Sequence, residues 1–233
     1  MQRTKTPVLT LDGPSGSGKG TIAQIIAGRL GWHYLDSGAL YRVLGLTAER
    51  RGVALDDEPG LCHLAESIRI DFIPQPDGTP ARVSVDREDV SNALRTESTG
   101  DLASRVAILP GVRAALLQKQ RNFRVNPGLV TDGRDMGTTV FPDALLKVFL
   151  VASPEVRAER RYKQLKEKGF DANLASILGE IRHRDRRDTE RSVSPLKPAE
   201  DAWILDCSAM TIEEVVQAVS DRLLVRQSGV QHV

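Results

Sequence analysis

The residues with the clearest chemical potential form a glycine-rich run that holds a single lysine. The run consists of Gly13, Pro14, Ser15, Gly16, Ser17, Gly18, Lys19, Gly20 and Thr21. Closely spaced glycines let backbone N–H groups turn inward around an anion, and the start of a helix adds partial positive charge. Because the run follows an apolar stretch typical of a strand and precedes helical spacing, it fits a P-loop. We expect these residues to bind a nucleoside triphosphate, with Lys19 reaching its β- and γ-phosphates. A purely structural glycine loop is the alternative.

Asp132 follows a second apolar stretch, residues 129–131, and is the candidate metal ligand. An acidic residue at the end of a buried strand beside a P-loop is typical of a Walker B group, which contacts Mg²⁺ directly or through water. A carboxylate that caps the following turn is the alternative. Gly20 stands where a P-loop usually has a metal-binding serine or threonine, and Thr21 comes one place later. This ending resembles the nucleoside monophosphate kinases, in which phosphates and water mostly hold the metal.

Three further stretches combine arginines with acidic and small residues. They are residues 36–42, residues 132–144, and residues 180–191 with the following 194–199. Together with the glycine-rich run they closely resemble the long-form bacterial cytidylate kinases, which are P-loop nucleoside monophosphate kinases. The resemblance extends from Val8 to about Leu224. It implies a five-stranded parallel core and a reversible, Mg²⁺-dependent transfer of a phosphoryl group from ATP to CMP or dCMP.

The resemblance also implies how the cytosine base is read. Cytosine presents an amine donor beside ring acceptors, so its recognition needs both acceptors and donors. Ser104 and Asp135 would accept hydrogen bonds from the exocyclic amine. Arg113 and Arg191 would donate to the ring acceptors.

The other acceptor residues implied by the resemblance are Ser37, Tyr41, Arg42, Arg134, Arg184 and Asp188. Arg184 and Asp188 would reach the ribose hydroxyls, and Ser37 and Tyr41 would shape the pocket. Arg42 and Arg134 lie at the carboxyl ends of neighbouring predicted strands, where open parallel sheets bind ligands. A monophosphate with about two negative charges needs cations of fixed geometry such as these.

Phosphoryl transfer depends on alignment, charge neutralisation and exclusion of water, so we expect no covalent enzyme intermediate. The expected catalytic side chains are Lys19, Arg134 and Arg184. Arg157 and Arg161, one helical turn apart, are expected to bind ATP. They belong to a predicted lid at about residues 157–191, which would close over the transferring phosphoryl group.

Several of these residues have ordinary structural roles as alternatives. Ser37 could cap a helix that begins near Gly38, and Tyr41 could belong to the core. Residues 182–191 could form a solvated helix face with internal ion pairs, as most charge runs do. Three charged side chains nevertheless share one helix face at spacings of four and three residues: Arg184, Asp188 and Arg191.

Short apolar runs alternate with helical spacing along the chain. Predicted strands cover residues 8–11, 32–35, 129–131, 148–151 and 203–205. Predicted helices cover residues 22–30, 40–51, 153–169, 174–181 and 211–223. Lys147, at the fourth strand, is expected to be an ordinary polar position. The alternation predicts an α/β fold, in which helices cover both faces of a parallel sheet.

One region departs from this pattern. Apolar and polar residues alternate over 68–72 and 81–85, with a turn-rich stretch at 74–80 between them. This pattern predicts a half-exposed antiparallel hairpin. We expect a small inserted subdomain over residues 63–103, similar to the CMP-binding domain of the longer bacterial enzymes. The P-loop kinase core would then comprise residues 1–62 and 104–233.

Composition restricts the classes of partner. The 233 residues have a net charge of +1, are 40% hydrophobic, and include 24 arginines but 8 lysines. The near-zero charge argues against bulk capture of nucleic acid or anionic membrane. Arginine suits bidentate binding of phosphate, although codon composition could also explain the excess. Two distant cysteines and no long apolar stretch favour a cytoplasmic protein without a membrane partner, and the resemblance favours a monomer.

Three other functions compete with this interpretation. Another P-loop small-molecule kinase, such as a UMP or AMP kinase, would share the phosphate loop but not the arginine-containing stretches. A GTPase would need a guanine-reading Asn/Thr-Lys-x-Asp element, which the sequence lacks. An RNA-binding protein would need a basic balance and an aromatic platform, whereas aromatic residues make up 4% of the chain.

Overall fold

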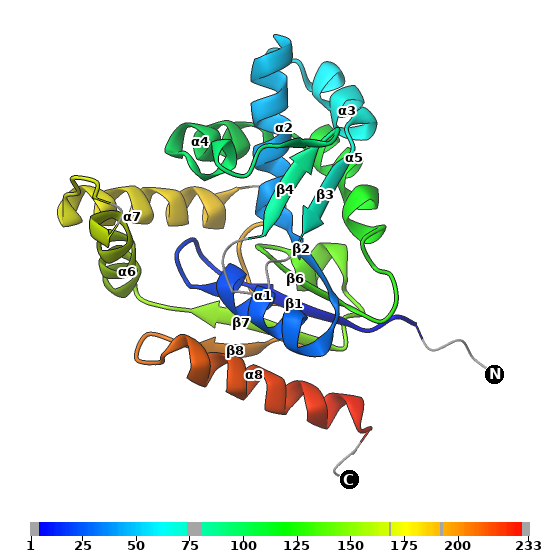
Figure 1. Ribbon diagram of the computed structural model, residues 1–233, viewed down its shortest axis with the longest axis vertical. Helices are drawn as coiled ribbons and strands as arrows, with labels where there is room; N and C mark the ends of the chain where they lie inside the picture. Colours follow the sequence, from blue (N-terminus) through cyan, green and yellow to red (C-terminus); the bar gives the residue numbers. More distant parts are fainter. Residues whose placement is uncertain (1–4, 74–80, 168, 192, 230–233) are drawn as a thin grey trace. The chain divides into compact units, whose positions relative to one another are not determined.

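The computed structural model describes residues 5–73, 81–167, 169–191 and 193–229 (Figure 1). A parallel sheet has the strand order β2-β6-β1-β7-β8. Its strands are β1 (Val8–Asp12), β2 (His33–Asp36), β6 (Leu129–Gly133), β7 (Leu146–Val151) and β8 (Trp203–Asp206). Each strand coincides with an apolar run of the sequence, which confirms the predicted α/β core. β1 and β6 are buried along their whole length, as strands covered on both faces must be.

The chain divides into two compact units, which are described separately. One consists of Met1–Val8 with Ala23–Asp132, and the other of Leu9–Ile22 with Gly133–Val233. The insertion expected over residues 63–103 falls inside the first unit, and its boundaries remain a prediction.

The first unit contains two pairs of packed helices. They are α2 (Ser37–Arg51) against α4 (Glu97–Val106), and α3 (Glu58–Ser67) against α5 (Pro110–Arg121). Asp36 caps α2 by accepting the backbone N–H of Ala39 at 2.9 Å, and Gly52 ends the helix with a φ of 68°. Gly45 allows the close approach of α4, because a Cβ there would lie 2.8 Å from the Cβ of Leu102.

A small antiparallel sheet also belongs to the first unit. β3 (Ile70–Ile73) pairs with β4 (Arg82–Val85), which pairs with β5 (Glu88–Asp89). Val83 and Val85 are buried, whereas Arg82 is exposed. The predicted half-exposed hairpin is therefore confirmed. The turn expected at residues 74–80 lies outside the described residues.

The second unit carries the helices of the C-terminal half. They are the π-helix η2 (Met136–Val140), α6 (Pro154–Glu167), α7 (Leu174–Glu190) and α8 (Ile212–Gln227). Figure 1 shows α6 and α7 as neighbouring helices, and their residues pack together. Ser153 Oγ accepts the backbone N–H of Val156 at 3.2 Å, and Thr211 with Glu214 completes the predicted capping box. These caps place α6 and α8 where the sequence predicts helices.

Lys147 is not the ordinary polar position that the sequence suggests. Its side chain is 7% exposed and its Nζ lies 2.8 Å from Asp201 Oδ1. A buried ammonium needs such a partner, because leaving it unpaired away from water is costly. The strand pattern could not reveal this, since the partner lies 54 residues further along the chain.

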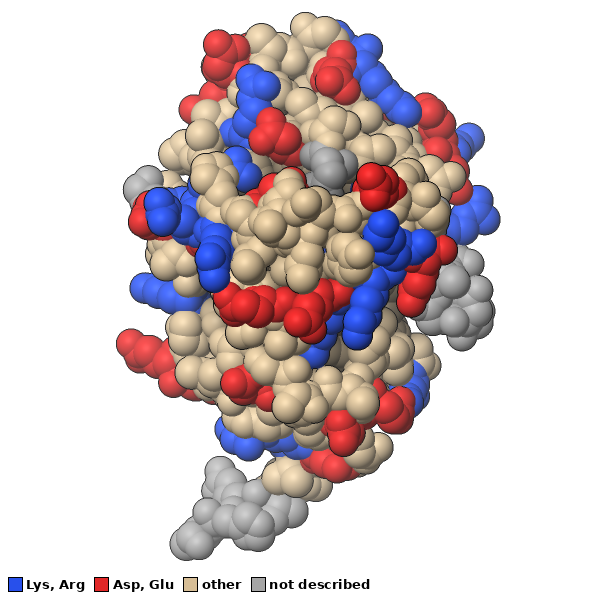
Figure 2. Space-filling view, turned by 90° about the vertical axis from the view of Figure 1, so that its left-hand side faces the viewer, with Lys and Arg blue, Asp and Glu red and all other residues tan. Residues whose placement is uncertain are grey.

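The surface carries charges of both signs. On the face drawn in Figure 2, basic and acidic side chains are interspersed rather than separated into two large regions. Within the described part of the chain, no helix combines the length and the apolar character needed to cross a membrane.

Candidate active site

The predicted phosphate loop joins β1 to α1 (Lys19–Leu30). Gly13 has a φ of 152°, and a Cβ at this position would stand 2.3 Å from the carbonyl oxygen of Leu150 on β7. Gly16 and Gly18 have φ values of 77° and 88°, which glycine adopts without strain. The glycines at these three positions are therefore favoured by the backbone path of the loop.

Polar side chains within the loop fit the binding of an anion. Lys19 is 8% exposed, and its Nζ donates to the Pro14 carbonyl at 3.0 Å. The hydroxyl of Ser17 is buried and has no hydrogen-bond partner among the described residues, so it can serve an oxygen of a bound phosphate. The buried Cys207 sulfur lies 3.6 Å from the Ser17 carbonyl oxygen and 3.2 Å from the Val151 carbonyl oxygen, so its single proton has two nearby acceptors.

Asp12, the last residue of β1, connects the phosphate loop to η2. Its two carboxylate oxygens accept the backbone N–H groups of Met136 at 2.9 Å and Gly137 at 2.8 Å. Burial raises the pKa of Asp12 from 3.8 to about 6, although the two N–H donors oppose the shift. Sequence reasoning missed this residue. The available signal was an acidic residue at the end of a buried strand, the same signal that singled out Asp132.

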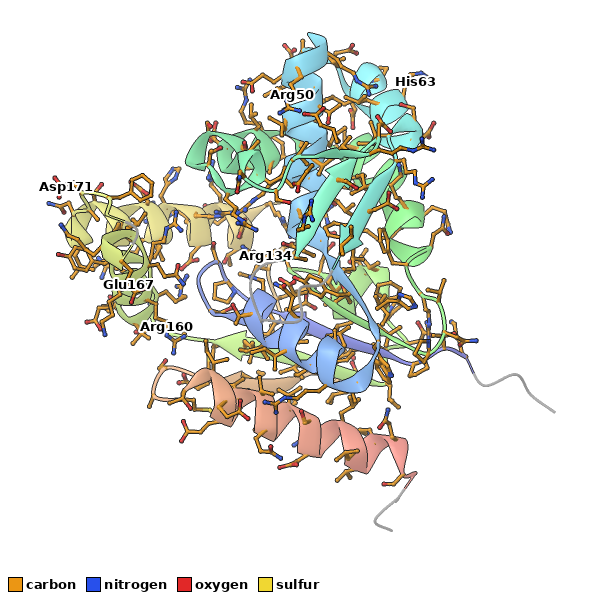
Figure 3. All side chains as sticks on the ribbon, in the orientation of Figure 1. Arg50, His63, Arg134, Arg160, Glu167 and Asp171 are labelled. Atoms are coloured by element: carbon orange, nitrogen blue, oxygen red, sulfur yellow. The ribbon has the colours of Figure 1, made fainter. Side chains whose placement is uncertain are left out.

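Arg134 lies between β6 and η2 and binds a residue of α7. Its Nε donates to Asp188 Oδ2 at 2.8 Å, and both side chains are largely buried. Burial alone would raise the pKa of Asp188, but the charge and hydrogen bond of Arg134, with Arg184 and Arg191, lower it overall. The second unit thus brings four predicted site residues together. Figure 3 labels Arg134 among these side chains.

The two arginines expected to bind ATP lie on α6 and differ in exposure. Arg157 is 2% exposed and binds protein groups, including the Ser15 carbonyl of the phosphate loop at 2.9 Å. Arg161 is half-buried. Their neighbour Arg160, labelled in Figure 3, donates to the Cys207 carbonyl at 2.8 Å. Contact of Arg157 or Arg161 with ATP remains a prediction.

Ser37 and Tyr41 lie on the first turns of α2 and are both buried. Asp36 caps the helix, so the alternative in which Ser37 is the cap is wrong. Ser37 Oγ instead donates to Gln120 Oε1 at 2.9 Å. The guanidinium of Arg113 lies 5.6 Å from the ring centroid of Tyr41, a cation–π distance. Two residues expected to contact the acceptor therefore lie together.

The remaining acceptor residues of the first unit have backbone partners. Arg42 Nη1 donates to the Leu94 carbonyl at 3.1 Å. Ser104 Oγ donates to the Gly100 carbonyl at 3.0 Å, one turn earlier in α4. Because this bond uses the hydroxyl proton, the Ser104 oxygen keeps lone pairs that could accept from an amine.

Asp132 is buried and accepts the phenolic proton of Tyr34 at 2.8 Å. Burial, followed by the charges of Asp132 and Asp36, raises the pKa of Tyr34 well above its ordinary value, so the phenol stays a donor at neutral pH. Among the described residues, no group of three or more His, Cys, Asp or Glu side chains could hold a metal ion. A metal that relies mainly on phosphate and water ligands would fit this donor set.

A parallel sheet whose first strand runs into a glycine loop and a helix-starting lysine defines the P-loop class of nucleotide-binding proteins. Within this class, the chain belongs to the cytidylate kinase family, whose family model matches residues 9–224.

Similar proteins support this assignment. A cytidylate kinase of Stutzerimonas stutzeri is 59% identical over 213 residues, which is 91% of this chain and 93% of that protein. A cytidylate kinase of Pseudomonas entomophila is 56% identical over 96% of this chain and 98% of that protein. A crystal structure of an uncharacterized protein from Eubacterium ventriosum has a TM-score of 0.51 at 10% identity, covering 94% of this chain and 98% of that one. This last similarity concerns the fold alone.

Proposed function

We propose that this protein catalyses the reversible transfer of a phosphoryl group from ATP to CMP or dCMP, giving ADP and CDP or dCDP. The bond between Asp12 and η2 is the observation that supports this most directly. It joins the start of the phosphate loop to the segment that carries Arg134. A donor-phosphate loop and an acceptor-side arginine are thereby parts of one hydrogen-bonded unit.

The phosphate loop and Lys19 would hold the β- and γ-phosphates of ATP, with Ser17 as an additional donor. Arg161 and Arg157 would assist from α6. Magnesium, when bound, would neutralise phosphate charge, with Asp132 as its one proposed protein ligand, directly or through water. Gly20 offers no hydroxyl to replace it.

Arg134 and Arg184 would place positive charge where negative charge develops during transfer. Asp188 would bind the ribose hydroxyls together with Arg184. The segment from residue 157 to residue 191 would act as the lid that excludes water, since an open site would hydrolyse ATP.

In the first unit, Ser37 and Tyr41 would shape the acceptor site and Arg42 would supply charge. Arg113, which is already fixed over Tyr41, would donate to the ring acceptors of cytosine. Ser104 would accept from the exocyclic amine through its free lone pairs. Asp135 is also proposed to accept from the exocyclic amine, and Arg191 is also proposed to donate to the ring acceptors.

We also propose residues 63–103 as the substrate-binding insertion. The reaction would belong to pyrimidine nucleotide metabolism in the cytoplasm, and the protein would act as a monomer without a nucleic-acid or membrane partner.

Coupled kinetics with CMP, dCMP, UMP and AMP as acceptors test the proposal. We expect kcat/KM for CMP to exceed the values for UMP and AMP by roughly 100-fold or more, because a base that leaves buried hydrogen-bonding groups unpaired is strongly rejected. Equal values for UMP or AMP would contradict the proposed base-reading residues and favour a UMP or AMP kinase.

A further inference from the structure

Arg157 of α6 makes an unusually complete set of contacts with the phosphate loop and α7. Its Nε donates to the Ala152 carbonyl at 2.9 Å, and Nη1 donates to the Ser15 carbonyl at 2.9 Å. Nη1 and Nη2 also bind the two carboxylate oxygens of Asp185, the first at 3.0 Å. The stem of the side chain packs on the loop, since a Cβ at Gly16 would lie 3.4 Å from the Cβ of Arg157.

Asp185 determines how the guanidinium of Arg157 is oriented. Asp185 is 24% exposed at its side chain, whereas that of Arg157 is 2% exposed. A bidentate carboxylate fixes the plane of a guanidinium, and the fixed plane then determines where the remaining N–H groups point. One of them points at Ser15, in the middle of the phosphate loop. An ion pair between two helices therefore determines a contact to the loop backbone.

We infer that Arg157 and Asp185 are a positioning pair, which holds the Ser15 backbone in the orientation that receives the phosphates of ATP. This inference rests on the proposed function. It assigns Arg157 an action through the loop in place of direct contact with ATP, because four hydrogen bonds to protein oxygens already engage the buried guanidinium. A buried ion pair adds little net stability over well-packed apolar residues, so its contribution here is geometric.

A lysine at position 157 would test the geometry without removing the charge. Lysine has a point charge and no planar fork, so it cannot serve Asp185, Ser15 and Ala152 together. Asp185→Asn is the second variant. It preserves the side-chain volume and leaves Arg157 unchanged, but it removes the charge and one of the two acceptor oxygens that bind the guanidinium. The matched control is the pair Arg182–Glu155, which joins the same two helices at 2.8 Å but is 62% and 53% exposed.

The full-length variants Arg157→Lys, Asp185→Asn, Arg182→Gln and Glu155→Gln would be compared by steady-state kinetics and by calorimetric titration with ATP. Because a misplacement of about 1 Å can cost about 100-fold, we expect kcat/KM for ATP to fall 10- to 100-fold in the first two variants. KM for CMP at saturating ATP should stay within about twofold in Arg157→Lys, and both controls should match the unmodified protein, as exposed pairs contribute little.

Unchanged ATP affinity in folded Arg157→Lys and Asp185→Asn would overturn the inference. Equal weakening of ATP and CMP in both variants would also overturn it, because the pair would then support the helices in general. Unfolding of both variants, seen by circular dichroism, would make the pair a folding determinant and would likewise contradict it. If the unmodified protein bound ATP but did not phosphorylate CMP, the proposed function would fail while the ATP titrations still tested the pair.

Discussion

Arg134 and Asp188 are direct partners, with Nε and Oδ2 2.8 Å apart and side chains 17% and 18% exposed. Both are expected to contact the acceptor nucleotide, so two binding residues also neutralise each other. The ion pair holds the Arg134 guanidinium in place before transfer begins. It also places a negatively charged carboxylate beside the expected phosphate site, which is unfavourable for binding an anion. Measuring unfolding at different pH values separates the contribution of this ion pair to stability from its contribution to catalysis.

Asp188→Asn should reduce the acid sensitivity of the fold. Because the pKa of Asp188 is lowered below 3.8, its ionised form stabilises the folded protein above that pH. This stabilisation is lost as the pH falls below 3.8 towards the lowered pKa. Urea unfolding at pH 7 should show the variant less stable by about 1–3 kcal/mol, and this difference should shrink below pH 4. A constant difference across this range would contradict the assignment.

Asp12→Asn should remove a pH dependence of activity. Asparagine has one acceptor oxygen for the two N–H groups of Met136 and Gly137, so we expect kcat/KM for ATP to fall roughly 100-fold at pH 7.5. In the unmodified protein, protonation of Asp12 should lower kcat/KM as the pH falls through about 6. The variant should lack this inflection, and a retained one would assign it to another group.

The same raised pKa has a consequence of opposite sign for stability. Stability contributed by protonated Asp12 is complete below pH 3.8 and is lost as the pH rises through about 6, on the order of 3 kcal/mol. Unfolding free energies of the unmodified protein and Asp12→Asn, measured at pH 4 and pH 7, would show this loss in the former alone.

Lys19→Met should lower kcat by roughly 1000-fold or more without unfolding the chain, because it removes the cation expected at the β- and γ-phosphates. Thermal melting should change little. Lys163→Met, an exposed position on α6, is the control and should retain activity. Near-normal turnover by folded Lys19→Met would refute the phosphate-loop assignment.

Gly13→Ala should be destabilising, because its Cβ would meet the Leu150 carbonyl oxygen at 2.3 Å. We expect a loss of about 3 kcal/mol in the free energy of unfolding. Gly28→Ala is the matched control, since, apart from the adjacent backbone of α1 itself, no described atom lies within 4 Å of its Cβ position. That change should stabilise the protein by about 0.5–1 kcal/mol. Equal effects at both positions, measured by urea denaturation, would exclude the steric explanation.

The sequence predicted the elements whose signals are local. The strands of the parallel sheet are apolar runs, and the capping box at Thr211 is legible by itself. By contrast, α4 contains serine, threonine and glycine, which are weaker helix formers than alanine or leucine, and it packs closely on α2 at Gly45. The helices α3, α4 and α5 were not predicted, although Asp57 and Thr96 cap the first two and Pro110 begins the third.

The site residues also divide into those predicted from local sequence and those whose partners lie far away in the chain. The glycine loop was predicted from types and spacing, whereas the partners of its charged groups were not. Asp12 binds backbone donors 124 and 125 residues away, and Arg157 binds Ser15 across 142 residues. Such pairings follow from strand order and helix packing, which a single sequence does not display.

The buried thiol of Cys207 lies against the Ser17 carbonyl, so the phosphate loop helps to cover it. A thiol-specific reagent such as dithionitrobenzoate can reach this 1% exposed side chain only when the surrounding backbone moves aside. In a Cys62→Ser background, which removes the other cysteine, the labelling rate would report how often the loop opens. Added ATP should slow labelling, so the reagent would measure nucleotide occupancy without any chemical turnover.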